Sequence, residues 1–431
     1  MSYVIISMHD RSSVVRALEF YSGIGGLHLA LKRSKVPGII VKAFDWDPNA
    51  AKVYDANYGP SLATKKDILE LSAPLLASYC ADFWILSPAC QPYTVLNPNA
   101  QGILDPRAKS FLHLVRNVLP ELVEMGAHPT HFLVENVGGF EGSTTRQIVI
   151  SQLHSLGYTT AEFLLTPLQF GIPNSRLRYY LLAKTAPFIF PTCVQPAKTY
   201  RCIPQYNEHD YETLSSWIDP RMNLDTELND VHATEIRHYL DDEDGSPSSP
   251  HLHAVSDRVL EKWGRLFDIV LPSTKRTCCF TRGYTQLVER AGSIIQMNTE
   301  LDTGKTFDSF LAAQAAGQQD AVSILRPLLL RYFTPSELLR IFHFNPPLHP
   351  KKIQSSLLST ISSTAIGAKR DESNDDESSH SNFEFVWPEG ISNKTKYRLI
   401  GNSVNVRVVT ELINFLYEDW EPGLTIARKN P

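Results

Sequence analysis

The sequence predicts an α/β fold, in which a mostly parallel, doubly wound sheet of the Rossmann-like type is joined to a smaller second domain. Between residues 17 and 184, short apolar runs alternate with longer amphipathic segments, which is the pattern of βαβ units. The chain has 431 residues, which exceeds one average domain, and 43% of them are hydrophobic, so it can bury a sizeable core. From about residue 191 to 325 turn residues and mixed helical patches replace this alternation, which indicates a separate unit.

The predicted sheet is formed by five apolar runs with amphipathic helices between them. Right-handed crossovers between such units bring the carboxyl ends of the strands to one edge. The expected strands are Ala17–Tyr21, Ile39–Phe44, Phe83–Leu86, His131–Val134 and Arg178–Ala183. The expected helices are Gly26–Lys32, Pro48–Asn57, Phe111–Val123 and Thr144–Leu156.

The last part of the chain is expected to return to the main domain. A helix should begin at the cap Thr334 and run to Phe342, and Val404–Tyr417 has one strongly apolar face. Residues 355–382 are rich in Ser, Asp and Glu and are expected to be a disordered insertion. The expected division is a tail at 1–16, a main domain at 17–190 and 326–431, and a second domain at 191–325.

Composition excludes several classes of protein. The net charge of −5 gives no basic surplus, although a local basic surface can exist on an acidic protein. The six cysteines form neither a CxxC pair nor a zinc pattern, so no metal site is expected. No run approaches the ~20 apolar residues of a membrane span, and no signal-peptide core is present. We therefore expect an intracellular protein, cytoplasmic, nuclear or both.

The first strand leads into a glycine-rich turn that could approach a ligand closely. Gly23, Gly25 and Gly26 follow Tyr21 and precede a helix, whose N-terminus favours polar ligands. No GxxxxGK[ST] motif follows, which excludes a P-loop. The alternative is a tight βα turn with no ligand.

Two later strand ends extend this candidate site. Asp45 could bind ribose hydroxyls and Trp46 could stack on adenine, whereas the neighbouring Asp47 can be a helix cap. Asp67, followed by Ile68, could accept from an exocyclic amine, although a solvated loop aspartate is the simpler reading. Together these features predict a nucleoside-bearing cofactor.

Chemistry-bearing side chains follow the next strands. Cys90 lies between Pro88 and the polar residues Gln91 and Thr94, which argues against a merely buried thiol. The strand after it ends in Glu135-Asn136, where the carboxyl could reach a ring nitrogen or pair with an arginine.

Two arginines introduce the last predicted strand. Arg176 and Arg178 share one face of an extended segment. They could hold a base carbonyl or a phosphate, or be surface residues.

These motifs occur in the order found in the cytosine-5 methyltransferases, and the sequence resembles that family. The resemblance covers residues 17–184 and 331–417. It rests on the glycine turn, Pro88–Gln91, Glu135–Val137, Arg176-x-Arg178 and Gly401-Asn402-Ser403-Val404.

The resemblance implies an S-adenosyl-L-methionine-dependent methyltransferase domain with a smaller target-recognition domain. It implies that Cys90 attacks C6 of cytosine, that Glu135 acts at N3, and that Arg178 holds O2 while Arg176 helps to order the site. Nearby positive charge should then lower the pKa of Cys90. The cofactor residues would be those of the glycine turn and strand ends together with Pro88, Asn402, Ser403 and Val404.

The middle region narrows the resemblance to the eukaryotic branch that methylates tRNA. Cys279-Phe280-Thr281 resembles the Cys-Phe-Thr element of that branch, whose substrate is a cytosine of the anticodon loop of tRNA-Asp, at position 38. Substrate contacts are therefore expected from Gln91, Thr94, Asn136, Cys279, Phe280 and Thr281. The protein is expected to be a monomer that binds tRNA and does not associate with a membrane.

Two alternatives stay open. A DNA cytosine-5 methyltransferase would share these motifs, and DNA is a possible second partner. A catalytically weak RNA-binding relative is the other, because Ala89 stands where the family usually has proline before the cysteine. Alanine can adopt the same φ but does not enforce it.

Overall fold

The computed structural model describes residues 14–93, 105–191, 194, 198–204, 233–242, 252–348 and 383–419. Thr94, most of the predicted tail and the predicted insertion at 355–382 lie outside these residues. Strand β1 (Val15–Phe20) begins inside the segment expected to be tail. None of the helices in this part of the chain is long and apolar enough to cross a membrane.

An eight-stranded sheet forms the centre of the larger unit, in the order β3-β2-β1-β4-β5-β7-β6-β8. The predicted parallel arrangement is confirmed except at β7, which runs antiparallel to both of its neighbours, β5 and β6. The strands after β1 are β2 (Gly38–Asp45), β3 (Ala63–Lys65), β4 (Phe83–Leu86), β5 (His131–Val137), β6 (Tyr158–Leu165), β7 (Arg178–Thr185) and β8 (Thr199–Tyr200).

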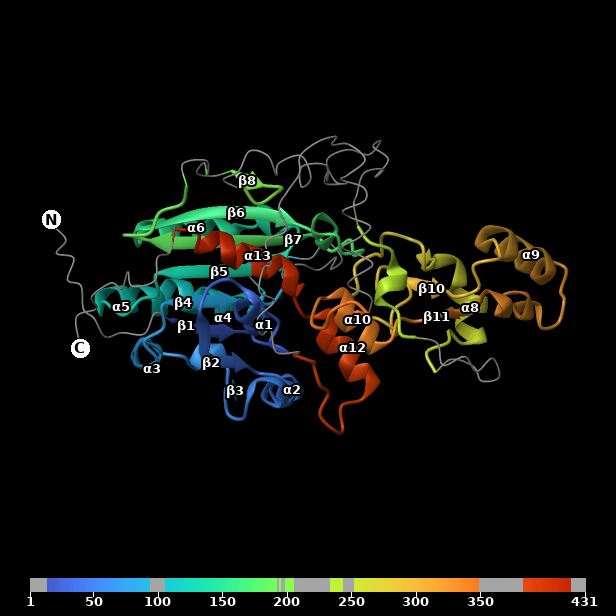
Figure 1. The fold of residues 1–431 in the computed structure, drawn as a ribbon, viewed down its shortest axis with the longest axis horizontal. Helices are drawn as coiled ribbons and strands as arrows, with labels where there is room; N and C mark the ends of the chain where they lie inside the picture. Colours follow the sequence, from blue (N-terminus) through green and yellow to red (C-terminus); the bar gives the residue numbers. More distant parts are fainter. Residues whose placement is uncertain are drawn as a thin grey trace, which may run out of the picture.

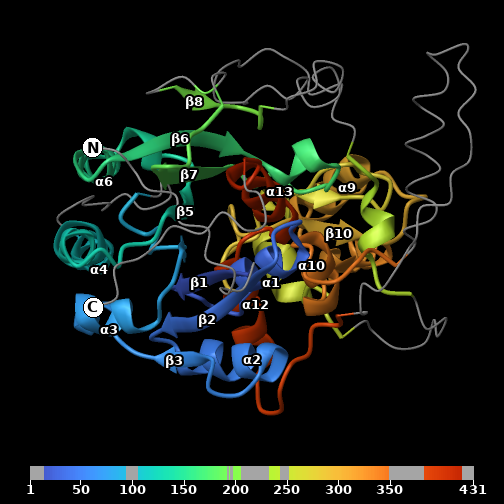
Figure 2. The same ribbon diagram turned by 60° about the vertical axis from the view of Figure 1, so that its left-hand side comes forward.

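Helices cover both faces of this sheet (Figures 1 and 2). One predicted helix is interrupted, because a π-helical turn at Leu114–Val118 separates α4 from α5. The helices of this part are α1 (Gly26–Arg33), α2 (Pro48–Tyr58), α3 (Ala73–Ser78), α4 (Lys109–His113), α5 (Leu119–Glu124), α6 (Thr144–Ser155), α12 (Asn393–Gly401) and α13 (Val406–Leu416).

The strand alternation divides the core into two layers. On β1, Ala17 packs into the layer that contains α1 and α13, whereas Leu18 and Phe20 pack into the opposite layer with α4, α5 and α6. On β5, Leu133 joins the first layer and Phe132 the second. Successive side chains of these strands therefore point into opposite layers, and helices cover both layers.

The second unit has its own small sheet and lies on the right in Figure 1. The strands β9 (Ile269–Val270), β10 (Ile294–Gln296) and β11 (Leu330–Arg331) are joined in the order β11-β10-β9. Helices α8 (Asp257–Trp263) and α9 (Thr303–Ala315) pack on a separate apolar cluster there. Because β11 lies beyond residue 325, the exact domain boundary stays a prediction.

The predicted helix start at Thr334 is confirmed and links the two units. Thr334 caps α10 (Pro335–Ile341): its hydroxyl accepts from the Glu337 amide, and the Thr334 amide donates to the Glu337 carboxylate. The buried Glu337 also binds Arg331 through two bonds of 2.8 Å. This buried pair fixes β11 of the small sheet to a helix that packs on the main core.

Helix α13 returns to the main sheet, as its apolar face predicts. Its Thr410 hydroxyl donates to the Ala30 carbonyl of α1 at 3.3 Å, and Leu412 is fully buried between the helices and the sheet. Helix α13 thus packs beside α1 and against β7 of the main sheet.

Truncation of Leu412 tests this packing. Leu412→Ala should lower the free energy of unfolding by about 2–5 kcal/mol, because it removes buried methyl groups and leaves a cavity. Urea unfolding followed by circular dichroism measures the loss. Glu411→Ala on the same helix removes a half-exposed ion pair with Arg407 and a hydrogen bond of 3.3 Å from the Asn414 amide, and it should cost about 1 kcal/mol or less. Equal losses in the two variants would contradict this account of α13.

Candidate active site

Neighbouring strand ends bring the predicted catalytic residues to one edge of the sheet. Leu86, at the end of β4, pairs with Val134 of β5, so the segment that leads to Cys90 leaves the sheet beside Glu135, the next residue of β5. Strand β7 enters at Arg178, which pairs with Val137. Three side chains far apart in the sequence therefore meet because of the strand order.

Glu135 is held in two ways. Its carboxylate accepts a hydrogen bond of 2.6 Å from the Ser87 hydroxyl and forms an ion pair with Arg178, whose Nε lies 3.3 Å from Oε1. Glu135 is buried, so these partners offset the cost of removing the carboxylate from water. The pairing with arginine weighed from the sequence is thus present, and it fixes Glu135 beside the cysteine.

Arg176 joins three segments of the chain. Its guanidinium donates to the carbonyls of Phe280 at 2.8 Å, Gly401 at 3.2 Å and Ser403 at 2.6 Å, and it lies over the ring of Phe342. Arg176 is only 3% exposed. This geometry fits the ordering role expected of it, rather than a direct contact with a base.

A second cysteine lies between the two arginines. The Cys279 sulfur is 3.4 Å from Arg176 Nη1 and 3.7 Å from Arg178 Nη2. Burial alone would raise the pKa of Cys279, but the guanidinium charges of Arg178 and Arg176 outweigh it and hold the pKa below its usual value. The two guanidinium groups therefore stabilise the thiolate form of Cys279.

Cys90 behaves in the opposite way, which corrects the prediction of a lowered pKa. Burial raises the pKa of the Cys90 thiol, Arg178 offsets only part of this effect, and Glu135 adds to it. The expectation was wrong because it considered the nearby positive charge but not the desolvation of the thiolate.

Two predicted substrate contacts have a structural role instead. The Phe280 ring is fully buried and packs edge-on against Tyr284 and Phe333, so its predicted contact with substrate is corrected to a core position. Asn136 is 1% exposed, and its amide donates to the Pro88 carbonyl at 3.4 Å. It therefore steadies the segment that carries Cys90. Gln91, Cys279 and Thr281 are half-buried near this edge.

The glycine turn is held by Asp45. Its two carboxylate oxygens accept from the amides of Gly23 and Asp47, each at 2.8 Å. Trp46 is 73% exposed, whereas Ile68 is buried and Asp67 caps the Leu69 amide at 3.0 Å. Asp47 is also the helix cap weighed from the sequence, because it accepts from the Asn49 amide.

The turn has features that suit a ligand. Gly23 has φ +53° and open space where a side chain would lie, and the buried Ser22 hydroxyl has no partner among the described residues. Tyr21 also adopts a positive φ of 56°, and its hydroxyl lies 2.9 Å from the Ser110 hydroxyl. Such strain in a bulky residue is typical of functional sites.

The Gly401–Val404 motif contacts both halves of the site. A Cβ on Gly401 would lie 2.3 Å from the Thr281 backbone, so only glycine permits this approach. A Cβ on Gly26 would meet Val404 at 2.8 Å and Ser403 at 3.0 Å. Asn402 is exposed at the end of α12.

Comparison with known proteins places the chain in a family. A family model described as C-5 cytosine-specific DNA methylase matches residues 15–346. The chain belongs to the cytosine-5 methyltransferase family.

Relatives of this methyltransferase match it over nearly its full length. A tRNA (cytosine(38)-C(5))-methyltransferase of Schizosaccharomyces pombe is 35% identical, covering 94% of this chain and 97% of that protein. A protein of the same name from Homo sapiens is 30% identical, with coverage of 94% and 99%. The crystal structure of the S. pombe Dnmt2 methyltransferase is similar with a TM-score of 0.66 and 32% identity, covering 94% of this chain and 99% of that one.

The motifs did not reveal every residue that builds the site of this methyltransferase. Ser87 binds Glu135, and a hydroxyl directly after a buried strand was the signal for it. Glu19 lies fully buried in β1. The sequence held a stronger signal for it, because a carboxylate stands inside the apolar run Ala17–Tyr21.

The charges around Cys90 predict opposite effects of two substitutions. Arg178→Gln should raise the pKa of Cys90 further and slow its alkylation by iodoacetamide at pH 8 severalfold, because a positive charge is lost. Glu135→Gln should lower that pKa and speed alkylation.

Peptide mass spectrometry would follow the alkylation of each cysteine separately. For the wild type, the rate at Cys90 should keep rising with pH above the ordinary thiol range. The exposed Cys80 should react equally in all three proteins. A change of the same sign in both variants would overturn this electrostatic account.

Proposed function

We propose that this methyltransferase transfers a methyl group from S-adenosyl-L-methionine to C5 of cytosine 38 in the anticodon loop of tRNA, with tRNA-Asp as the substrate. The arrangement of Cys90, Glu135 and Arg178 at one sheet edge carries the chemical part of this proposal. The names of the relatives, tRNA (cytosine(38)-C(5))-methyltransferases, support the choice of tRNA.

The residues at the glycine turn fit the proposed cofactor. Open space over Gly23, the Ser22 hydroxyl, which has no partner in the described part of the chain, and the exposed ring of Trp46 suit a ligand with an amino-acid group and an adenine. Asp45 has further lone pairs for the ribose hydroxyls. S-adenosyl-L-methionine, when bound, supplies an electrophilic methyl group. The remaining contacts are assigned to Tyr21, Asp67, Ile68, Pro88 and the Asn402–Val404 segment.

The chain's own residues would make cytosine reactive. C5 of cytosine is a poor nucleophile, so the Cys90 thiolate first attacks C6, which breaks the aromaticity and makes C5 enamine-like. Glu135 acts at N3 and Arg178 at O2, where they stabilise the charge that develops in the ring. After methylation, loss of the C5 proton expels Cys90 and restores the ring.

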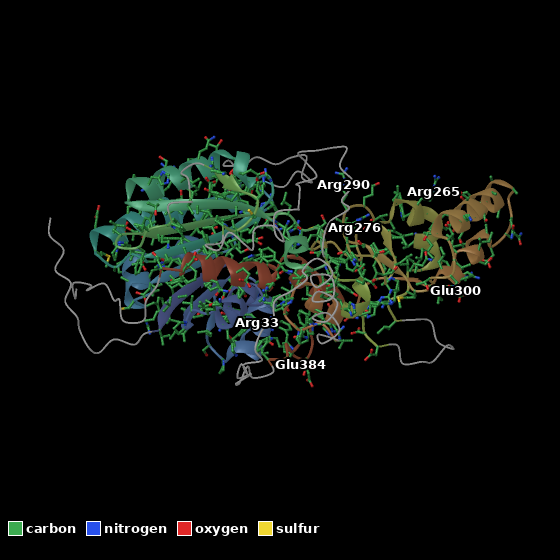
Figure 3. The ribbon with its side chains drawn as sticks, turned by 45° about the horizontal axis from the view of Figure 1, so that its top comes forward. Arg33, Arg265, Arg276, Arg290, Glu300 and Glu384 are labelled. Carbon is green, nitrogen blue, oxygen red and sulfur yellow. The ribbon has the colours of Figure 1, made fainter. Side chains whose placement is uncertain are left out.

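A tRNA loop suits this site because the target base must leave its stack. That step costs least in a single-stranded loop. The chain is acidic overall, but exposed arginines lie along one side of the second unit, where Figure 3 labels Arg265, Arg276 and Arg290. Such residues can contact phosphates.

Covalent trapping tests the proposed reaction. A tRNA-Asp transcript that carries 5-azacytosine at position 38 should form an adduct with the wild type in the presence of S-adenosyl-L-methionine, because the modified ring blocks release of Cys90. Denaturing gel electrophoresis and peptide mapping would detect it. Cys90→Ala should form none, whereas Cys80→Ala, which alters an exposed thiol, should match the wild type.

Competing substrates separate the alternatives. Transfer of labelled methyl groups should favour tRNA-Asp over duplex DNA and over the same tRNA with uridine at position 38. Preference for duplex DNA would support the DNA methyltransferase alternative. Binding of tRNA without transfer or adduct would support the non-catalytic RNA-binding alternative.

Ala89 offers a test of how tightly the cysteine segment is held. Ala89→Pro should raise kcat about two- to fivefold, because proline reduces the freedom of the segment by roughly 0.4–1 kcal/mol. Ala89→Gly should lower kcat, since glycine adds freedom. Single-turnover methyl transfer measures both. An unchanged or lower rate for Ala89→Pro would show that Asn136 and the turn at Tyr93 already hold the segment.

A further inference from the structure

A buried chain of hydrogen bonds lies beneath the Gly23–Gly26 turn. Glu19 of β1 is fully buried, and its Oε1 accepts from the His28 amide at 3.3 Å. Its Oε2 lies 2.6 Å from the Tyr54 hydroxyl, which in turn lies 2.8 Å from Nδ1 of His28. Glu19, Tyr54 and His28 therefore form a closed ring of contacts between β1, α2 and α1.

This ring bears directly on the glycine turn. The rings of His28 and Tyr58 are stacked with centroids 4.1 Å apart, and the Tyr58 hydroxyl donates to the Gly25 carbonyl at 2.8 Å. A Cβ on Gly25 would lie 2.2 Å from the Tyr58 ring. Gly25 is the N-cap of α1 and has no side chain to bind the helix amides. The carboxylate of Glu19 instead accepts a hydrogen bond from the His28 amide in the first turn of the helix.

The ring has two possible orders of protons. When Glu19 is ionised it accepts from Tyr54, and His28 then carries its proton on Nδ1 and donates to the Tyr54 oxygen. When Glu19 is protonated it donates to Tyr54, which donates to an unprotonated Nδ1. A single proton on Glu19 therefore reverses the direction of both hydrogen bonds and changes the tautomer of His28.

The surrounding charges set where this change occurs. Burial raises the pKa of Glu19 to about 8, against the bonds from Tyr54 and the His28 amide, and Asp45 of β2 adds to the rise. Burial, with a contribution from Lys32, lowers the pKa of His28 to about 4, so the imidazole stays neutral. Burial and Glu19 raise the pKa of Tyr54 well above its usual range, and the same two causes act on Tyr58, where Arg33 opposes them.

We propose that Glu19, acting through Tyr54, His28 and Tyr58, is a proton-responsive positioning residue that couples the cofactor affinity of the glycine turn to pH. This inference rests on the proposed binding of S-adenosyl-L-methionine at that turn. The ionised form gives the stronger, charge-assisted cap to α1 and places negative charge near a turn that receives a sulfonium ligand. Affinity should therefore rise as pH rises through the neutral to mildly alkaline range.

Calorimetric titration of the full chain with S-adenosyl-L-methionine between about pH 6.5 and pH 9.5 tests the proposal. Affinity of the wild type should increase about fivefold over this range, the lower end of typical coupling between two sites. Glu19→Gln fixes the neutral form and should remove this increase. Any titration of the ligand itself is common to both proteins and cancels in the comparison.

Two further variants make the assignment specific. Tyr54→Phe breaks the ring of hydrogen bonds while leaving Glu19 in place, and it should also flatten the pH dependence of affinity. Glu124→Gln, which neutralises an exposed carboxylate on α5, should keep the wild-type dependence. S-adenosylhomocysteine lacks the sulfonium charge and should show a smaller increase than S-adenosyl-L-methionine.

Thermal stability gives a readout that does not depend on the ligand. A carboxyl with a raised folded-state pKa favours the protonated folded form, so its stabilising contribution is complete below pH 4.5 and is lost as pH rises to about 8. Glu19→Gln should therefore melt near the wild-type temperature in acid and above it at pH 8.5.

The outcomes separate this inference from the proposed function. Absence of binding at every pH would refute the cofactor assignment itself. Binding with the same pH dependence in the wild type, Glu19→Gln and Tyr54→Phe would overturn the role of Glu19 while leaving the cofactor assignment intact. If Glu19→Gln does not fold, Tyr54→Phe decides the question alone.

Discussion

The buried guanidinium of Arg176 is the interaction on which the assembled site depends. A charge removed from water must be compensated, and Arg176 is compensated by carbonyls of Phe280, Gly401 and Ser403. These carbonyls come from the second unit and from the C-terminal part of the main domain, whereas Arg176 precedes β7. A lysine could not reach all three, because it lacks the planar fork of donors. One side chain thus fixes the distance between the catalytic edge and the Cys-Phe-Thr element.

This arrangement also explains why two cysteines near the same arginines differ. Cys279 lies within contact distance of both guanidinium groups, so their charge overcomes burial. Cys90 shares Arg178 with the carboxylate of Glu135, which reduces the benefit of that charge. A thiol with a raised pKa is mostly protonated at neutral pH, so the nucleophile forms most readily when a bound ligand brings additional positive charge.

Much of the fold could be predicted because its signals are local. The helix starts at Asp47 and Thr334 could be recognised from their capping residues. The βαβ alternation predicted most of the strands of the main sheet. Strand β6 was not predicted, although it follows α6 and runs parallel to β5, and β7 lies between these two strands in the sheet. Cys90, Glu135 and Arg178 were found from linear motifs. The burial that raises the pKa of Cys90 and places Phe280 in the core depends on residues distant in sequence, so no local pattern could reveal it.

The Gly401–Val404 motif contacts both the glycine turn and the Cys-Phe-Thr element. Gly401 lets α12 touch the backbone at Thr281, and the next residues pack against Gly26 at the start of α1. The same segment supplies two of the carbonyls that bind Arg176. A displacement of the glycine turn would therefore shift the Cys-Phe-Thr element, because the Gly401–Val404 segment contacts both. Because close-packed contacts of this kind transmit strain, the cofactor turn and the base-recognition element should be regarded as one unit.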